Sequence, residues 1–333
     1  MTEEKNSTAV LTEETQTSPA ASETSVEAQA EATASAQSMP SGDVAPDKKK
    51  KPKSTMRRVK NIPPMSMLVP FIMVNRVGSQ NFITDRISVT KLEKYLKEKQ
   101  AEGMKNISMM HVLIAAYNRM AAKRPAVNRF IRGQRVWTRD EMEVSLTIKK
   151  EMSLESPDTV VKMTLPRGAS MREVYDALNH EIVSYREQPG GDFDNTAKVL
   201  SYIPALLLKF VIWLLKLLDY FGLIPRFLTG VSPFHCSLFI TSMGSLGIPP
   251  IYHHLYDFGT CPVFCSFGAK KRSYELNPDG SVYKQSYMDV TFVTDERICD
   301  GYYFASGWKM MKSILKDPWQ LDQPAEEVLQ DIP

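Results

Sequence analysis

The residues best suited to chemistry lie near the C-terminus, in the run Asp295-Glu296-Arg297-Ile-Cys-Asp300-Gly301. Three carboxylates and one guanidinium fall within six residues, between a predicted strand at 288–294 and a helix that begins after the glycine. Where charged residues lie this close together at the end of a strand, they form ion pairs with one another or take part in proton transfer. Residue content alone favours a solvated turn that caps the helix, so the rest of the chain has to decide between these interpretations.

The most hydrophobic stretch, residues 203–228, is a candidate contact surface. Lys209 and Lys216 lie seven residues apart, on one face of a helix, and nearly all other side chains around them are apolar. A transmembrane helix needs about 20 apolar residues, and here a charge interrupts much earlier. Two interpretations remain. The helix lies on a membrane with its lysines reaching the headgroups and Trp213 at the boundary, or it is buried between subunits or under a substrate channel.

Length and composition are those of an ordinary globular protein. The chain has 333 residues and a net charge of +3, which is too small to indicate nucleic-acid binding. Its four cysteines are too few for a disulfide framework, and no Cys/His set has the spacing of zinc ligands. Reduced thiols and no metal are therefore expected. The acidic N-terminus lacks the apolar segment of a secretory signal, so we expect a cytoplasmic protein.

Residues 1–60 are expected to be a disordered acidic tail followed by a basic linker, and residues 61–333 a single folded domain. The first segment has no aromatic residue and cannot bury enough apolar surface to offset its conformational entropy. The lysine cluster at 48–53 is typical of an anionic-membrane tether, a nucleic-acid patch or a nuclear address, or of a solvated linker.

Periodicity, caps and turn residues predict the elements of the folded part. We expect Ser108 to cap a mostly buried helix, and Ser170 with Glu173 to form a capping box. His111, in the first turn of its helix, is interpreted as structural. The predicted helices are 90–100, 109–123, 171–186 and 304–315; the predicted strands are 65–74, 82–89, 127–131, 135–137, 144–150, 159–165, 237–242, 262–267 and 287–294.

The order of these elements resembles the chloramphenicol acetyltransferase superfamily, which includes the catalytic domain of the 2-oxoacid dehydrogenase acyltransferases. That family carries His-x-x-x-Asp-Gly after a strand, and Asp-His-Arg-x-x-Asp-Gly in the dehydrogenase branch, where this chain has Asp-Glu-Arg-x-x-Asp-Gly at 295–301. Residues 239–247 resemble the family's Phe-Thr-Ile-Ser-Asn-Leu-Gly segment, and 263–268 fit the strand that follows. The resemblance covers about 65–320. It implies an α/β two-layer sandwich of a mixed sheet packed by helices, assembled as a trimer with sites between subunits.

The resemblance assigns roles to three residues. In the family the motif histidine accepts the proton of the nucleophile that attacks an acyl thioester, and a hydroxyl supports the oxyanion. The base position here is Glu296, and the hydroxyl is that of Ser242 or Thr241. A carboxylate titrates near 4.3 and imidazole near 6.5, so a glutamate base has to be strengthened by burial.

The same resemblance makes the rest of the frame, from Asp295 to Gly301, structural. It implies that Asp300 pairs with an arginine, Arg297 or Arg86. His253 and His254 follow the Ser242 strand, and Asp257 comes shortly after them. A histidine oriented by that carboxylate could replace the missing base, while the alternative is a pair of loop histidines with structural hydrogen bonds.

The chain is expected to be a stand-alone relative, because the first 60 residues have no room for a folded lipoyl domain. The leading hypothesis is transfer of an acyl group from a CoA-type thioester to a small acceptor by a homotrimer, without a lipoyl group or metal. The alternative is a catalytically silent protein that contacts a membrane or partner through Lys209, Trp213 and Lys216.

Overall fold

The computed structural model describes residues 56–149, 158–187 and 198–333, and the predictions for residues 1–55 lie outside this part. The main sheet has the strand order β2-β9-β8-β7-β5-β6. Its short central strand β7 runs parallel to β5 and β8, whereas the other neighbours are antiparallel. The strands are β2 (Gln80–Ser88), β5 (Glu141–Lys149), β6 (Asp158–Pro166), β7 (Leu238–Ser242), β8 (Val263–Leu276) and β9 (Val282–Asp295).

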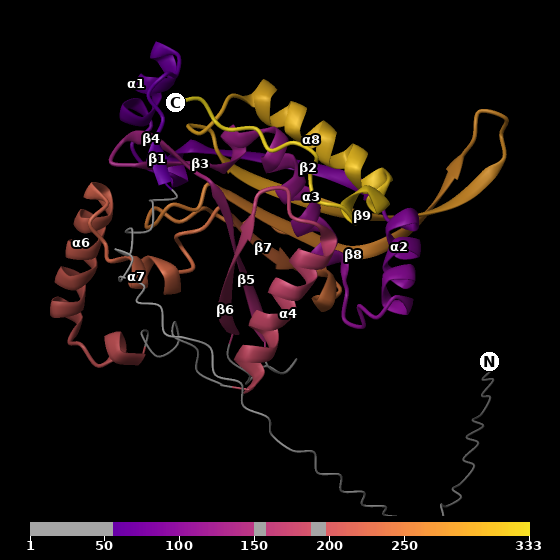
Figure 1. Cartoon of the computed structure of the whole chain (residues 1–333), viewed down its shortest axis with the longest axis horizontal. Coiled ribbons are helices and arrows are strands. Elements are labelled where there is room, and N and C mark those ends of the chain that lie inside the picture. Colours follow the sequence, from indigo (N-terminus) through magenta and orange to yellow (C-terminus); the bar gives the residue numbers. More distant parts are fainter. Residues whose placement is uncertain (1–55, 150–157, 188–197) are drawn as a thin grey trace, which may run out of the picture. The chain divides into compact units, whose positions relative to one another are not determined.

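Helices cover one face of this sheet (Figure 1). They are α2 (Thr90–Ala101), α3 (Met109–Lys123), α4 (Met171–Glu187) and α8 (Gly301–Lys316). Successive strand residues point to opposite faces, so Leu238 and Ile240 pack beneath the helices, while Phe239 and Phe264 belong to a smaller apolar cluster on the other face. The predicted two-layer α/β sandwich with a mixed sheet is confirmed.

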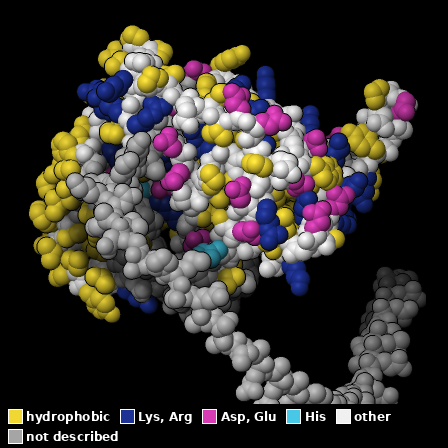
Figure 2. All heavy atoms as spheres, in the orientation of Figure 1, with side chains coloured by type: hydrophobic (Ala, Val, Ile, Leu, Met, Phe, Trp, Pro, Cys, Tyr) yellow, Lys and Arg dark blue, Asp and Glu magenta, His cyan; other side chains and the backbone are white. Residues whose placement is uncertain are grey.

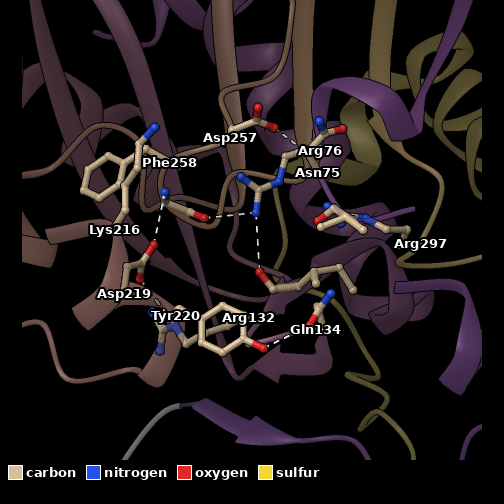
Figure 3. Close-up of a pocket in the computed structure, with 14 residues that line it drawn as sticks. Asn75, Arg76, Arg132, Gln134, Lys216, Asp219, Tyr220, Asp257, Phe258 and Arg297 are labelled. Carbon is tan, nitrogen blue, oxygen red and sulfur yellow. Dashed lines mark hydrogen bonds and ion pairs between the residues drawn. The ribbon is translucent and has the colours of Figure 1, made fainter. Parts of the chain in front are cut away.

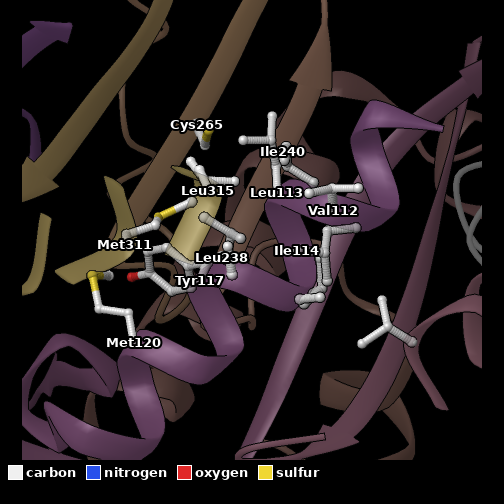
Figure 4. Packing of buried hydrophobic residues seen from close by; sticks show 14 of the residues in the cluster. Val112, Leu113, Ile114, Tyr117, Met120, Leu238, Ile240, Cys265, Met311 and Leu315 are labelled. Carbon is white, nitrogen blue, oxygen red and sulfur yellow. The ribbon is translucent and has the colours of Figure 1, made fainter. Parts of the chain in front are cut away.

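The core is built around α3, whose ends agree with the sequence prediction. Ser108 caps it, and the ring of His111 completes a capping box in place of the usual Glu or Gln. Every residue from 111 to 122 is buried. Figure 4 shows Tyr117 of this helix among side chains of β7 and α8, including Leu238 and Met311. A helix covered on all sides in this way holds its first turn in a fixed position against the sheet.

Residues 65–74, predicted as an extended segment, form a helix instead. α1 (Pro64–Ile72) has Pro63 at its N-cap and Pro64 at its first position, where the fixed φ of proline suits a helix and its missing N–H is not needed. A short apolar run without alternation does not distinguish a strand from a helix. Met65 and Ile72 are 63% and 69% exposed, so this helix presents apolar side chains to solvent.

The hydrophobic stretch divides into α6 (Ala205–Phe221) and α7 (Arg226–Val231). Gly222 adopts a left-handed conformation with φ 69° and ends α6, and Pro225 caps the next helix. The single helix expected at 203–228 is therefore broken at the point where glycine provides this conformation without steric cost.

Two hairpins complete the fold. β3 (Arg129–Arg132) and β4 (Arg135–Arg139) form the predicted hairpin, and β1 (Met56–Arg58) pairs with β4, so regular pairing begins before residue 60. β8 and β9 extend further than predicted, because they continue past the sheet as a two-stranded arm (Figure 1). The arm ends in the predicted turn, where Asn277 and Ser281 bond and Gly280 has φ 82°.

Candidate active site

The charged turn after β9 is held by a buried ion pair between Asp295 and Arg297. Two guanidinium nitrogens of Arg297 donate to the two carboxylate oxygens, each at 2.8 Å, and its backbone N–H donates to Oδ1 at 3.1 Å. The two side chains are 0% and 2% exposed. A bidentate pair in this setting imposes one geometry on the turn, which in turn sets the direction of the side chain between them.

A second arginine, Arg76, which no sequence pattern indicated, joins this pair. Its Nε donates to Asp295 Oδ2 at 3.3 Å, and its other nitrogens donate to the carbonyls of Tyr256 and Gly259 at 2.5 and 2.9 Å. Figure 3 shows this guanidinium at the centre of its pocket, with Arg297 close by. Because the contacts join segments more than 170 residues apart, no local pattern signals them.

The Asp257 carboxylate is not hydrogen-bonded to His253 or His254 within the described part of the chain, so it does not orient either ring as the alternative base. The carboxylate accepts the backbone N–H groups of Arg76 and of the next residue, at 2.9 and 3.0 Å. His253 stacks on Phe264, with ring centroids 4.1 Å apart, and its Nδ1 bonds the carbonyl of His254 at 2.8 Å. Burial lowers the pKa of His253. The described residues that line the Glu296 cavity include neither histidine.

Glu296 is exposed, whereas Asp295 and Arg297 on either side of it are buried. Its backbone N–H donates to the carbonyl of Ser79 at 2.8 Å, so the main chain is anchored while the carboxylate faces outward. Glu296 lines a cavity of about 900 Å³, which is bounded by the turn, the start of α1, the segment 123–126 and the C-terminal residues 329–332. Small-molecule sites commonly span roughly 300–1,000 Å³, and Lys123 and Arg124 bring positive charge to this one.

Asp300 caps α8, where its carboxylate accepts the backbone N–H of Tyr303 at 2.8 Å. The implied ion pair with an arginine does not form. Arg297 is engaged within the turn, and Arg86 bonds a carboxylate on β9 at 3.4 Å. A Cβ placed on Gly301 would meet no atom within 4 Å. No steric contact within the described part of this subunit therefore requires a glycine at this position.

The cysteines do not provide a nucleophile. All four are free thiols, and three are buried. Burial raises the pKa of Cys299, which lies next to the turn, to about 12, so this thiol stays protonated near neutral pH. Within residues 56–149, 158–187 and 198–333, no group of three or more His, Cys, Asp or Glu side chains is arranged to hold a metal ion.

Ser242 lies at the end of β7 and lines a different cavity, of about 520 Å³, between α3, α4, the ends of β5 and β7, and Phe267 of β8. Thr241 and Ser242 are both half-buried. None of the described residues lines both this cavity and the one that holds Glu296. One subunit therefore does not bring the two predicted partners into a shared pocket. The Ser242 cavity contains His111 instead, a side chain that the sequence analysis treated as structural.

Helix α6 is attached to the sheet side through its one buried residue among those described, Asp219. The carboxylate accepts from Nε2 of His235 at 3.2 Å and from the backbone N–H of Gly259 at 3.2 Å, and Arg132 lies 3.6 Å away. Burial alone would raise the pKa of Asp219, but His235 and Arg132 outweigh it and hold that pKa below its ordinary value. Asp219 is therefore an ionised anchor for the helix.

The other face of α6 is apolar and open to solvent. Figure 2 shows hydrophobic side chains gathered over this helix, and Trp213 is 55% exposed. Lys209 and Lys216 are exposed as well. No helix of the described part is long and apolar enough to cross a bilayer. The exposed apolar residues of α6 are Leu206, Leu207, Phe210, Ile212, Trp213, Leu214, Leu217, Tyr220 and Phe221.

Comparison with known proteins gives structural matches only. No protein-family model matches the sequence, and no curated protein matches it either. A probable dihydrolipoamide acetyltransferase from Listeria monocytogenes superposes with a TM-score of 0.50 and 11% identity over 81% of this chain and 98% of that one. The dihydrolipoamide acetyltransferase of Azotobacter vinelandii superposes with a TM-score of 0.49 and 10% identity over 79% of this chain and 93% of that one. A chloramphenicol acetyltransferase superposes with a TM-score of 0.46 and 12% identity over 75% of this chain and 94% of that one. At such identities the likeness shows the fold.

Proposed function

This chain has the chloramphenicol acetyltransferase-like fold, and on that basis we propose an acyltransferase that passes an acyl group from a CoA-type thioester to a small acceptor. The placement of Glu296 carries the proposal. Asp295 and Arg297 are committed to the buried ion pair, and Asp300, which is exposed in the same cavity, is committed to the helix cap. The Glu296 carboxylate serves neither purpose, and it is exposed in a cavity large enough for a substrate.

The proposed reaction needs a base and an oxyanion donor. The Glu296 carboxylate accepts the proton of the acceptor as its oxygen, nitrogen or sulfur attacks the thioester carbonyl. The hydroxyl of Ser242 or Thr241 donates to the tetrahedral oxyanion. The intermediate then collapses, the C–S bond breaks, and the CoA thiolate takes up the proton. Lys123 and Arg124, on the wall of the same cavity, are suited to the anionic part of CoA.

The site requires two subunits. Glu296 and Ser242 line separate cavities of one subunit, so we propose that a neighbouring copy in a homotrimer supplies the hydroxyl. This arrangement makes complementation possible, because a subunit that lacks the carboxylate can still donate its Ser242 to the next one.

The test measures acyl-CoA turnover by wild type, Glu296→Gln and Ser242→Ala, followed by the two variants co-assembled in equal amounts. Each variant alone should be inactive, and random co-assembly should restore about one quarter of the sites. Rates at background for all proteins, wild type included, would remove the enzymatic proposal. If both single variants keep wild-type activity, neither Glu296 nor Ser242 takes part in the reaction. Inactive single variants without recovery in the mixture would contradict the shared site.

A second function, peripheral membrane contact, is favoured by the exposed apolar face of α6. The exposed face of α6 is apolar and includes Trp213, and Lys209 and Lys216 flank it. Such a face suits the boundary of an anionic bilayer. Such contact would make the protein membrane-peripheral, with or without catalysis.

Flotation with vesicles containing phosphatidylserine tests this second function. The wild type should float, and the triple variant K209E/W213A/K216E should stay at the bottom. A matched control changes three exposed residues on the hairpin arm, Arg272, Tyr274 and Lys284, and should float like the wild type. Wild-type protein that remains at the bottom, or equal flotation of all three proteins, would contradict a role for α6.

A further inference from the structure

The Ser242 cavity contains a buried hydrogen-bond donor that no described residue satisfies. His111 is 2% exposed. Its Nδ1 accepts the backbone N–H of Ser108 at 3.1 Å, and burial lowers its pKa to about 4. The ring is therefore neutral and carries its proton on Nε2. That nitrogen is buried and has no partner within the described part of the chain, which is rare enough in proteins to call for an explanation.

A second donor lies on the same cavity. Asn179, on α4, lines it together with His111, and its Nδ2 is also buried and without a partner among the described residues. Two elements that are far apart in sequence thus each contribute to the wall of one cavity a residue with an unused N–H donor. A ligand group that satisfies both must be an acceptor, such as a carbonyl or carboxylate oxygen.

Most of the other residues that line the cavity are apolar, and Asn106, Ser108, Thr147 and Ser242 add polar groups. The cavity volume of about 520 Å³ lies within the usual range for small-molecule sites, roughly 300–1,000 Å³. An apolar wall with a few fixed polar groups is the general character of such sites. The apolar lining includes Ile107, Met110, Leu146, Leu178, Ile182 and Phe267.

We propose that this cavity binds the aliphatic chain of a fatty acid or acyl group, whose carbonyl or carboxylate oxygen accepts from His111 Nε2 and Asn179 Nδ2. The inference rests on the proposed function only in naming the ligand an acyl group, and it identifies the acyl class as aliphatic. Binding itself requires neither Glu296 nor an acceptor molecule. Ser242 lies on the wall of the same cavity.

Isothermal titration at pH 7 with decanoate tests the inference, and decylammonium serves as a probe of equal chain length that has donors only. Wild type should bind decanoate and should not bind decylammonium. His111→Asn keeps an acceptor for Ser108 but removes the Nε2 donor, and Asn179→Asp exchanges the donor for an acceptor. Each should weaken decanoate binding roughly tenfold or more, because one hydrogen bond to a charged group is lost.

Two controls separate this site from other effects. His111→Gln places an amide nitrogen where the imidazole has Nε2, and should retain most of the affinity. Glu296→Gln should bind decanoate like wild type even where it abolishes turnover, so the site and the proposed reaction can fail independently. The inference is overturned if decanoate does not bind, if His111→Asn and Asn179→Asp both bind it as wild type does, or if decylammonium binds equally well.

Discussion

Lowering the pH from 7 to 4.5 should reduce the free energy of unfolding by about 2.5 kcal/mol through His111 alone. The pKa of this residue is about 4 in the folded protein, against an ordinary value of 6.5. Above 6.5 neither state binds the proton. Between 6.5 and 4 the unfolded chain binds it and the folded chain does not, so stability falls as the pH falls. Below 4 both states are protonated and the loss stops growing.

The cause of this effect is burial without a counter-charge. His111 contacts the Ser108 N–H and hydroxyl, and its ring lies 5.5 Å from that of Tyr175. Protonation would turn Nδ1 from an acceptor into a donor and so break the capping box. A charge buried without an anionic partner is strongly disfavoured.

Urea unfolding of wild type and His111→Asn at pH 7 and 4.5, at one protein concentration, isolates the effect. Wild type should lose about 2.5 kcal/mol more than the variant. Burial also lowers the pKa values of His235 and His253. Both residues are present in each protein, so their contributions to the pH dependence cancel in the comparison. A difference between the two proteins below about 0.5 kcal/mol, near the error of extrapolation, would show that the buried ring accepts a proton without penalty and would refute the reasoning.

Four further substitutions test the structural parts of the site by urea unfolding at pH 7. Asp295→Asn leaves two buried guanidinium groups without their anion and should cost about 3–5 kcal/mol, whereas Arg86→Ala removes an exposed pair and should cost less than about 1 kcal/mol; equal losses would contradict the distinction. Asp300→Ala should cost about 1 kcal/mol through the lost N-cap, and an unchanged midpoint would show that the cap is dispensable. Gly301→Ala should be neutral or stabilise by up to about 1 kcal/mol, because the added methyl meets no atom within 4 Å; a large loss would indicate that a neighbouring subunit packs against this glycine.

Local patterns predicted most elements well, for a physical reason. The capping residues of α3 and α4 contact groups only three residues away, and the inward residues of a helix or strand follow its own period. The prediction failed at α1, where a short apolar run has no distinguishing period, and at Gly222, where one residue in a left-handed conformation divides a helix.

The sequence by itself determined the order of the elements, the helix caps and the frame at 295–301, because these depend on residues that are neighbours in the chain. Only the tertiary structure decided how the charges pair. Arg76 and Asp295 are 219 positions apart, and no local pattern reports such a contact. The cavities were decided in the same way. Folding places Glu296 and Ser242 in separate cavities. It brings His111 and Asn179 to one cavity with their donors unused, because the packing of α3 and α4 on the sheet sets the position of each side chain.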